Sequence, residues 1–116
     1  MSESNRMTGE LLVKISERFP NIWAWRNNRV DAMAVGSGGR MRRVSAGLDG
    51  QADIAFVLGP MGRFGGIEVK AGKDKMRDSQ KHWSAKLMAM GGAYLLCRDV
   101  SVTLEELAVI YRGEGN

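Results

Sequence analysis

The chain is poor in the residues that build disulfides and zinc sites. Its 116 residues include one cysteine, Cys97, and one histidine, His82. One cysteine cannot form an internal disulfide, and the two residues together cannot supply the four ligands of a usual structural zinc site. His82 would also have to serve any Ser-His or Cys-His couple, yet it lies between Lys81 and Trp83 in a helical pattern. These counts exclude a disulfide scaffold and structural zinc, and they disfavour both hydrolase classes.

The sequence also lacks a long apolar run. None approaches the roughly 18 consecutive apolar residues of a membrane-spanning helix, and residues 1–6 are polar, unlike the start of a signal peptide. A length of 116 residues, 44% hydrophobic and 26% charged, fits one compact domain over residues 1–116. We therefore expect a single soluble domain in the cytoplasm.

Positive charge exceeds negative charge, with 17 Lys and Arg against 13 Asp and Glu and a formal net charge of +4. The net charge is +3 in residues 1–50 and +3 in residues 51–100, whereas residues 101–116 carry −2. A basic excess over most of the chain favours an anionic partner such as nucleic acid.

Hydrophobic spacing predicts three helices and at least four strands. A helix from Met7 to Phe19 ends at Pro20, a second covers residues 76–90, and a third begins at a Thr103–Glu106 capping box. Strands are predicted at residues 22–27, 52–58, 64–70 and 93–97, the middle two forming a hairpin. Residues 28–39 predict a mobile basic loop because they are rich in glycine, and residues 40–44 could start a further strand. The order αβββαβα predicts a mixed sheet with helices packed on it, an α/β or α+β sandwich.

Two tryptophans lie in the first predicted strand. Trp23 and Trp25 share one face, and Ile22 and Ala24 share the other, so both faces are expected to be largely covered. Tryptophan in a strand is more often a core or interface residue, although this pair could also stack on unpaired bases.

Charged residues interrupt the apolar hairpin strands at three positions. The strand period of two puts Glu68 and Lys70 on one face, and a tight turn would bring Asp53 opposite the end of the second strand. Two carboxylates beside a lysine suit a divalent cation such as Mg²⁺, which can activate water for attack on a phosphate. A solvated ion pair is the alternative, but charges within apolar strands usually have a partner or a metal.

These residues belong to a longer pattern that resembles a known family. The chain resembles the VRR-Nuc family of the PD-(D/E)xK nuclease superfamily over roughly residues 10–98, although Ala52 stands where the superfamily often has proline. The residues that carry the resemblance are Gly47, Gly50 and Asp53, then Ile67, Glu68, Val69 and Lys70, then Ser79, Gln80 and Lys81. The resemblance implies an α/β fold with a restriction-endonuclease-like core, in the order αβββαβ with a C-terminal helix, and a mixed central sheet flanked by helices.

The resemblance also implies roles for single residues. Asp53, Glu68 and the backbone carbonyl of Val69 would bind Mg²⁺ or Mn²⁺, Lys70 would assist the attacking water, and Gln80 would support the site. Lys70 is expected to remain protonated without metal, so it would orient the water or stabilise negative charge.

Glu10 resembles an acidic position that approaches the metal in some members of the family. An ion pair with Lys14, four residues further along the helix, is the alternative reading of Glu10.

Two basic groups could contact DNA phosphates. One group comprises Arg40, Arg42 and Arg43, and the other comprises Lys73, Lys75, Arg77 and Lys81. The alternatives are a solvated strand edge for the first group and ordinary helix-entry charges for the second.

Together these readings predict a Mg²⁺- or Mn²⁺-dependent endonuclease that hydrolyses phosphodiester bonds in DNA, with branched or otherwise structured DNA as the expected substrate. Symmetric cleavage of a four-way (Holliday) junction requires two active sites, so a homodimer is expected. Its interface candidates are Trp23, Trp25 and the methionines of the second and last elements. A restriction-like nicking nuclease and a catalytically silent DNA-binding or assembly module are the alternatives.

Overall fold

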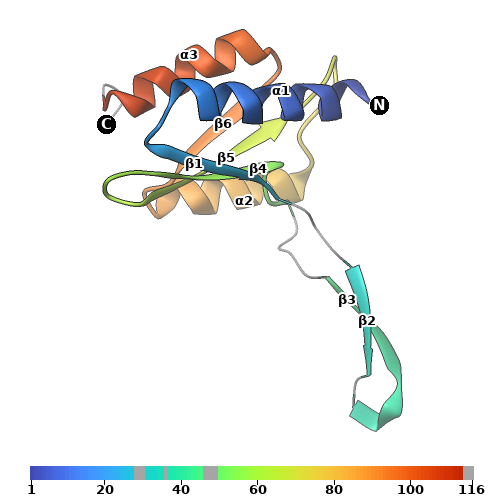
Figure 1. The fold of residues 1–116 in the computed structure, drawn as a ribbon. Helices are drawn as coiled ribbons and strands as arrows, with labels where there is room; N and C mark the ends of the chain where they lie inside the picture. The colour runs from blue at the N-terminus through green and yellow to red at the C-terminus, as the bar shows by residue number, and fades with distance from the viewer. Residues whose placement is uncertain (28–30, 36, 46–49, 114–116) are drawn as a thin grey trace.

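The computed structural model describes residues 1–27, 31–35, 37–45 and 50–113, and for residues 31–35, 37 and 41–45 it describes the backbone alone (Figure 1). Its elements follow in the order α1 (Glu3–Arg18), β1 (Ile22–Arg26), β2 (Asp31–Val35), the 3-10 turn η1 (Ser37–Gly39), β3 (Met41–Ser45), β4 (Ile54–Leu58), β5 (Arg63–Val69), α2 (Asp78–Ala89), β6 (Ala93–Cys97) and α3 (Val100–Tyr111).

Four of the strands form one mixed sheet in the order β1-β4-β5-β6. β1 pairs antiparallel with β4, and β4 pairs antiparallel with β5 across a short turn. β6 pairs parallel with β5. The two strands can run in the same direction because α2 carries the chain from the end of β5 back to the level at which β5 begins. The predicted hairpin and the α/β class with a mixed sheet are confirmed.

Helices cover both faces of this sheet, with α1 and α3 on one side and α2 on the other (Figure 1). The α1 and α3 side holds the apolar core, because the alternation of β4 and β5 turns Ile54, Phe56 and Ile67 towards it. Its fully or nearly fully buried members are Met7, Leu11, Ile15, Phe19, Ile22, Ile54, Phe56, Ile67, Val69, Ala93, Cys97, Val100, Leu104, Leu107 and Ala108.

β2 and β3 form a separate antiparallel ribbon that projects away from the sheet (Figure 1). The predicted loop over residues 28–39 is therefore wrong at Asp31–Val35, whereas the strand suggested at residues 40–44 is confirmed by β3. The glycines that suggested a loop make the turn of the ribbon instead, since Gly38 and Gly39 both have positive φ angles. Residues 28–30 and 36 of the predicted loop lie outside the described residues.

Two helices begin earlier than the sequence predicted. α1 begins at Glu3, where the side chain of Ser2 accepts the backbone N–H of Asn5. α3 begins at Val100, where Asp99 Oδ1 accepts the N–H of Val102. The Thr103–Glu106 capping box is thus wrong: Asp99 is an equally good N-cap, and the apolar side of α3 extends back to it.

The first strand is also less covered than predicted. Trp23 is 72% exposed and Trp25 is 36% exposed, so their face of β1 is not buried in this chain. The reason is the position of β1 at the edge of the sheet, with α1 packed against its other face.

Among the described residues, no helix is both long enough and apolar enough to cross a membrane.

Candidate functional site

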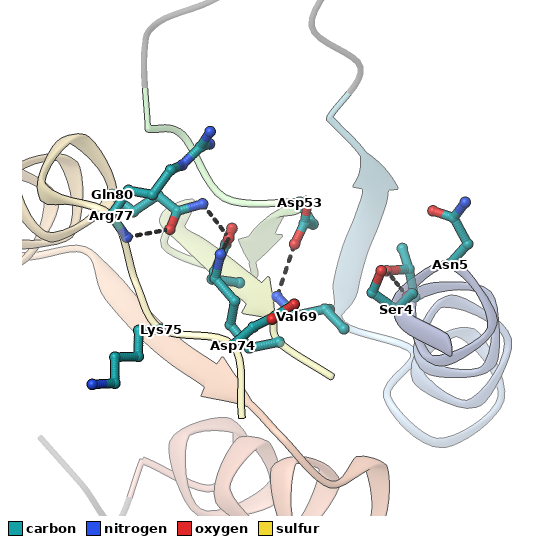
Figure 2. Close-up of a pocket in the computed structure, with 11 residues that line it drawn as sticks. Ser4, Asn5, Asp53, Val69, Asp74, Lys75, Arg77 and Gln80 are labelled. Carbon is teal, nitrogen blue, oxygen red and sulfur yellow. Dashed lines mark hydrogen bonds and ion pairs between the residues drawn. The ribbon is translucent and has the colours of Figure 1, made fainter. Parts of the chain in front are cut away.

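The two predicted carboxylates come together at one end of the β4–β5 hairpin. Ile54 pairs with Ile67, so the next pair outward in the antiparallel register is Asp53 with Glu68. Asp53 Oδ2 accepts the backbone N–H of Val69 at 2.8 Å (Figure 2). This bond fixes the Asp53 carboxylate against the end of β5.

Glu68 is a buried charge with an incomplete set of partners. Its side chain is 3% exposed, and its Oε2 lies 3.5 Å from Lys70 Nζ and accepts a hydrogen bond of 2.6 Å from Gln80 Nε2. Its other oxygen, Oε1, is buried and has no hydrogen-bond partner among the residues that the structure describes. A buried carboxylate oxygen without a donor is costly, so the metal-free site leaves Glu68 incompletely satisfied.

Gln80 orients Glu68 from the first turn of α2. The backbone N–H of Arg77 donates to Gln80 Oε1 at 2.8 Å, which leaves the amide nitrogen to face Glu68 (Figure 2). Gln80 is itself buried. The predicted supporting residue therefore contacts the carboxylate directly, and its amide orientation is set by the helix that carries it.

The environment of Glu68 disfavours its negative charge. Burial, together with the nearby charge of Asp53, raises the pKa of the Glu68 carboxyl to about 7, although Lys70 opposes this shift. Near neutral pH the metal-free site thus holds a proton for much of the time. A bound cation would favour the ionised form in place of that proton.

A cleft of about 420 Å³ opens onto these groups (Figure 2). It lies where the first turns of α1 and α2 approach the ends of β4 and β5. The cleft is lined by Ser4, Asn5, Thr8, Asp53, Glu68, Val69, Lys70, Asp74, Lys75, Arg77 and Gln80. The α1 residues and Asp74 were not predicted as part of the site, and the run of charges around Asp74 is the one sequence signal that points to any of them.

Tyr94 is a further residue that the sequence did not single out. Its hydroxyl is buried and has no hydrogen-bond partner among the described residues. The pKa of Tyr94 is raised, first by burial and then by the charges of Glu68 and Asp53, so the phenol remains neutral beside the site. Its position in the apolar strand β6 gave no sign of this proximity.

The donor set of the cleft fits a hard divalent cation. Mg²⁺ is usually held by one or two carboxylates and keeps its other positions for water and phosphate oxygens. Asp53 and Glu68 supply two carboxylates, and the unpartnered Glu68 Oε1 is a free donor atom. In the part of the chain that the structure describes, no group of three or more His, Cys, Asp and Glu side chains forms a fuller metal cage.

The predicted DNA-binding residues divide between the cleft and other surfaces. Lys75 and Arg77 line the cleft. Lys73 and Lys81 are exposed but are not among its lining residues. Arg40 is exposed just before β3, whereas Arg42 and Arg43 lie in β3 and their side chains are outside the description, as is Gly47 of the family pattern.

Glu10 is not brought to the carboxylate pair. Its two oxygens accept hydrogen bonds from Lys14 Nζ at 2.7 Å and from an Arg6 nitrogen at 2.9 Å, along one side of α1. This arrangement matches the ion pair that was the alternative to a metal contact.

Comparisons with known proteins add no relative to this description. The chain matches no family model, no curated protein and no solved structure. A function for this chain is therefore inferred from the residues and the geometry of the cleft.

Proposed function

We propose that the protein is a metal-dependent endonuclease that hydrolyses phosphodiester bonds in DNA. The observation that carries this proposal is the meeting of Asp53, Glu68 and Lys70 in one cleft, with Glu68 Oε1 buried and unpartnered among the described residues. A structural ion pair would gain nothing from leaving that oxygen unbound, whereas a metal site requires a free oxygen.

Each residue of the cleft would have its own role in hydrolysis. Asp53 and Glu68, with the carbonyl of Val69, would hold Mg²⁺ or Mn²⁺, which would supply an activated water and neutralise charge on the phosphate. Lys70, 3.5 Å from Glu68, is placed to orient that water or to stabilise the negative charge that develops on the phosphate. Gln80 keeps the Glu68 carboxylate in position through its 2.6 Å hydrogen bond.

The rim of the cleft supports an anionic polymer as the substrate. Lys75 and Arg77 flank the carboxylates, and the chain as a whole carries a net charge of +4. Cations beside a metal site bind the phosphates on either side of the one that reacts. The carboxylates of Asp53, Glu68 and Asp74 in the same cleft would repel the substrate without these cations and a bound metal.

The chain order supports the restriction-endonuclease-like core that the family resemblance implies. When the β2–β3 ribbon is set aside, α1, β1, β4, β5, α2 and β6 follow the order αβββαβ, with α3 as the C-terminal helix. Branched DNA, including four-way junctions, is the substrate that we propose, and cleavage of both strands would require a homodimer.

Cleavage assays test this proposal directly. Linear, flapped and four-way-junction DNA would be incubated with Mg²⁺, Mn²⁺ or a chelator. Wild type should cut in either metal and not in chelator, and Glu68→Gln and Asp53→Asn should abolish cleavage with DNA affinity nearly unchanged.

Glu10→Gln is the matched control, because it makes the same chemical change on α1 outside the cleft. Glu10→Gln should cut at the wild-type rate. Wild-type rates in Glu68→Gln would refute the assignment, and binding without cleavage in every metal would identify a silent module.

A further inference from the structure

The edge strand β1 presents two exposed indole rings side by side. Trp23 and Trp25 have ring centroids 5.4 Å apart with an interplanar angle of 58°. They are 72% and 36% exposed, so neither is a core residue of this chain. We call these two side chains the Trp shelf.

The shelf begins where α2 stops covering the sheet. Trp25 pairs with Ala55, and Ala55 pairs with Gly66, so the three residues form one row on the same face. At the Gly66 end, α2 lies so close that an added Cβ would meet the Trp83 ring at 3.0 Å. Ala55, in the middle of the row, is 1% exposed, whereas Trp25 at the other end is 36% exposed. One half of this face is therefore covered by α2, and the half that carries the shelf is not.

The shelf faces the same side of the sheet as the carboxylate pair. Asp53 precedes Ala55 by two residues, so strand alternation puts both on one face. From strand rise and spacing, the Cα atom of Trp25 lies about 8 Å from that of Asp53, and the Cα atom of Trp23 about 14 Å from it. A polymer held at the carboxylates would thus reach Trp25 first and then Trp23.

A cation lies on the same side of the sheet. α2 approaches this side through Trp83, whose ring lies 3.0 Å from the position of a Cβ on Gly66 of β5. Lys86 follows Trp83 by three residues, so it lies on the neighbouring surface of the helix, and it is exposed. Exposed aromatic rings and a lysine on one side of a protein form a combination that binds single-stranded nucleic acid, in which bases stack and phosphates pair with cations.

We propose that the Trp shelf binds unpaired bases of the DNA strand that enters the cleft, an inference that rests on the proposed nuclease function. The two rings are in mutual contact at 5.4 Å, and their interplanar angle of 58° turns their faces in different directions. They therefore cannot both lie flat on adjacent parallel bases of a duplex strand, and each ring suits a base that has left the stack, as in a flap or an open branch. The shelf thus selects substrates with a single-stranded segment beside the cut.

Binding in the presence of a chelator tests the shelf without cleavage. A short oligo(dT) and a duplex of equal length would be titrated into the protein, with tryptophan fluorescence and anisotropy as the readouts. Wild type should show quenching by oligo(dT). Trp23→Ala should weaken oligo(dT) binding by at least about fivefold, the lower end for one stacked base, with duplex affinity unchanged. The double variant with Trp25→Ala should weaken it further.

Two controls keep this result specific. Replacing both rings by phenylalanine should restore most of the oligo(dT) affinity, since a stacking surface returns. Val13→Ala removes a 57% exposed apolar side chain from α1 and should change neither affinity. If the double variant fails to fold by circular dichroism, Trp23→Ala alone carries the test, because that ring is mostly exposed.

Three outcomes would overturn the proposal: unchanged oligo(dT) affinity in Trp23→Ala, an equal loss for duplex, or a wild-type dimer in light scattering that the tryptophan variants dissociate. The last result would assign this face to a second copy of the chain. Failure of the nuclease function would look different, because wild type would bind oligo(dT) through the shelf and yet cut no DNA in Mg²⁺ or Mn²⁺.

Discussion

Gly50 lies four residues before β4 and packs against the first turn of α2, and its replacement by alanine should loosen the site. Its φ angle is +79°, a conformation that costs an alanine roughly 1–2 kcal/mol. An added Cβ would also lie 2.1 Å from the carbonyl oxygen of Ser79, a backbone atom that cannot rotate away. Relief of such overpacking typically costs a further 1–3 kcal/mol or so.

Gly62 provides a matched control for this substitution. Its φ angle is +75°, nearly the same as that of Gly50, but a Cβ added there would meet nothing within 4 Å. Gly62→Ala should therefore lower the free energy of unfolding by about 1–2 kcal/mol, the backbone cost alone. Gly50→Ala should lower it by about 2–5 kcal/mol, since the contact with α2 adds to the same backbone cost.

Urea denaturation of the two variants measures the difference. Gly50→Ala should also weaken Mg²⁺ or Mn²⁺ binding, because Gln80 follows Ser79 and would be pushed away from Glu68, whereas Gly62→Ala should leave metal affinity unchanged. Equal losses of stability in the two variants, with equal metal affinity, would refute the claim that this contact positions α2 against the carboxylates.

Three further predictions concern the same site. Tyr94→Phe removes a buried hydroxyl without a partner among the described residues, so the free energy of unfolding should stay the same or rise by up to roughly 1–3 kcal/mol; a clear loss would reveal a partner. The pKa of Glu68 is raised to about 7, so the folded metal-free protein binds an extra proton between about pH 4.5 and 7. Its stability should therefore fall as pH rises through this window, and Glu68→Gln should flatten the curve; an unchanged slope in the variant would contradict the shift. If about six to ten phosphates are neutralised, DNA affinity should fall roughly 10³- to 10⁵-fold between 50 and 200 mM salt; a flat response would point to a protein partner.

The centre of the site was predictable from the sequence because it is local. Asp53 and Glu68 belong to two strands of one hairpin, so the register of a short turn was enough to place them opposite each other. The presence of three helices and of the four sheet strands also followed from hydrophobic spacing, which gives the type of each element better than its ends.

The remainder depends on contacts between distant parts of the chain. Asn5 reaches the cleft only because α1 packs across the sheet, some way along the chain from Asp53, and no spacing rule predicts that approach. The exposure of Trp23 was missed for a related reason. Alternation shows that two tryptophans share a face, but it cannot show whether a helix covers that face.

The β2–β3 ribbon leaves the sheet and returns to it at a single point. Arg26 at the end of β1 pairs with Ile54 at the start of β4, and the N–H of Asn27 donates to the carbonyl of Asp53 at 2.8 Å. The intervening segment is thus an excursion whose ends are held together by the sheet. Doubling the length of such a closed segment costs only about 0.6 kcal/mol in chain entropy. Evolution or protein engineering can therefore lengthen, shorten or replace the segment, and so change the surface that this part of the chain can contact. The register that places Asp53 opposite Glu68 stays the same.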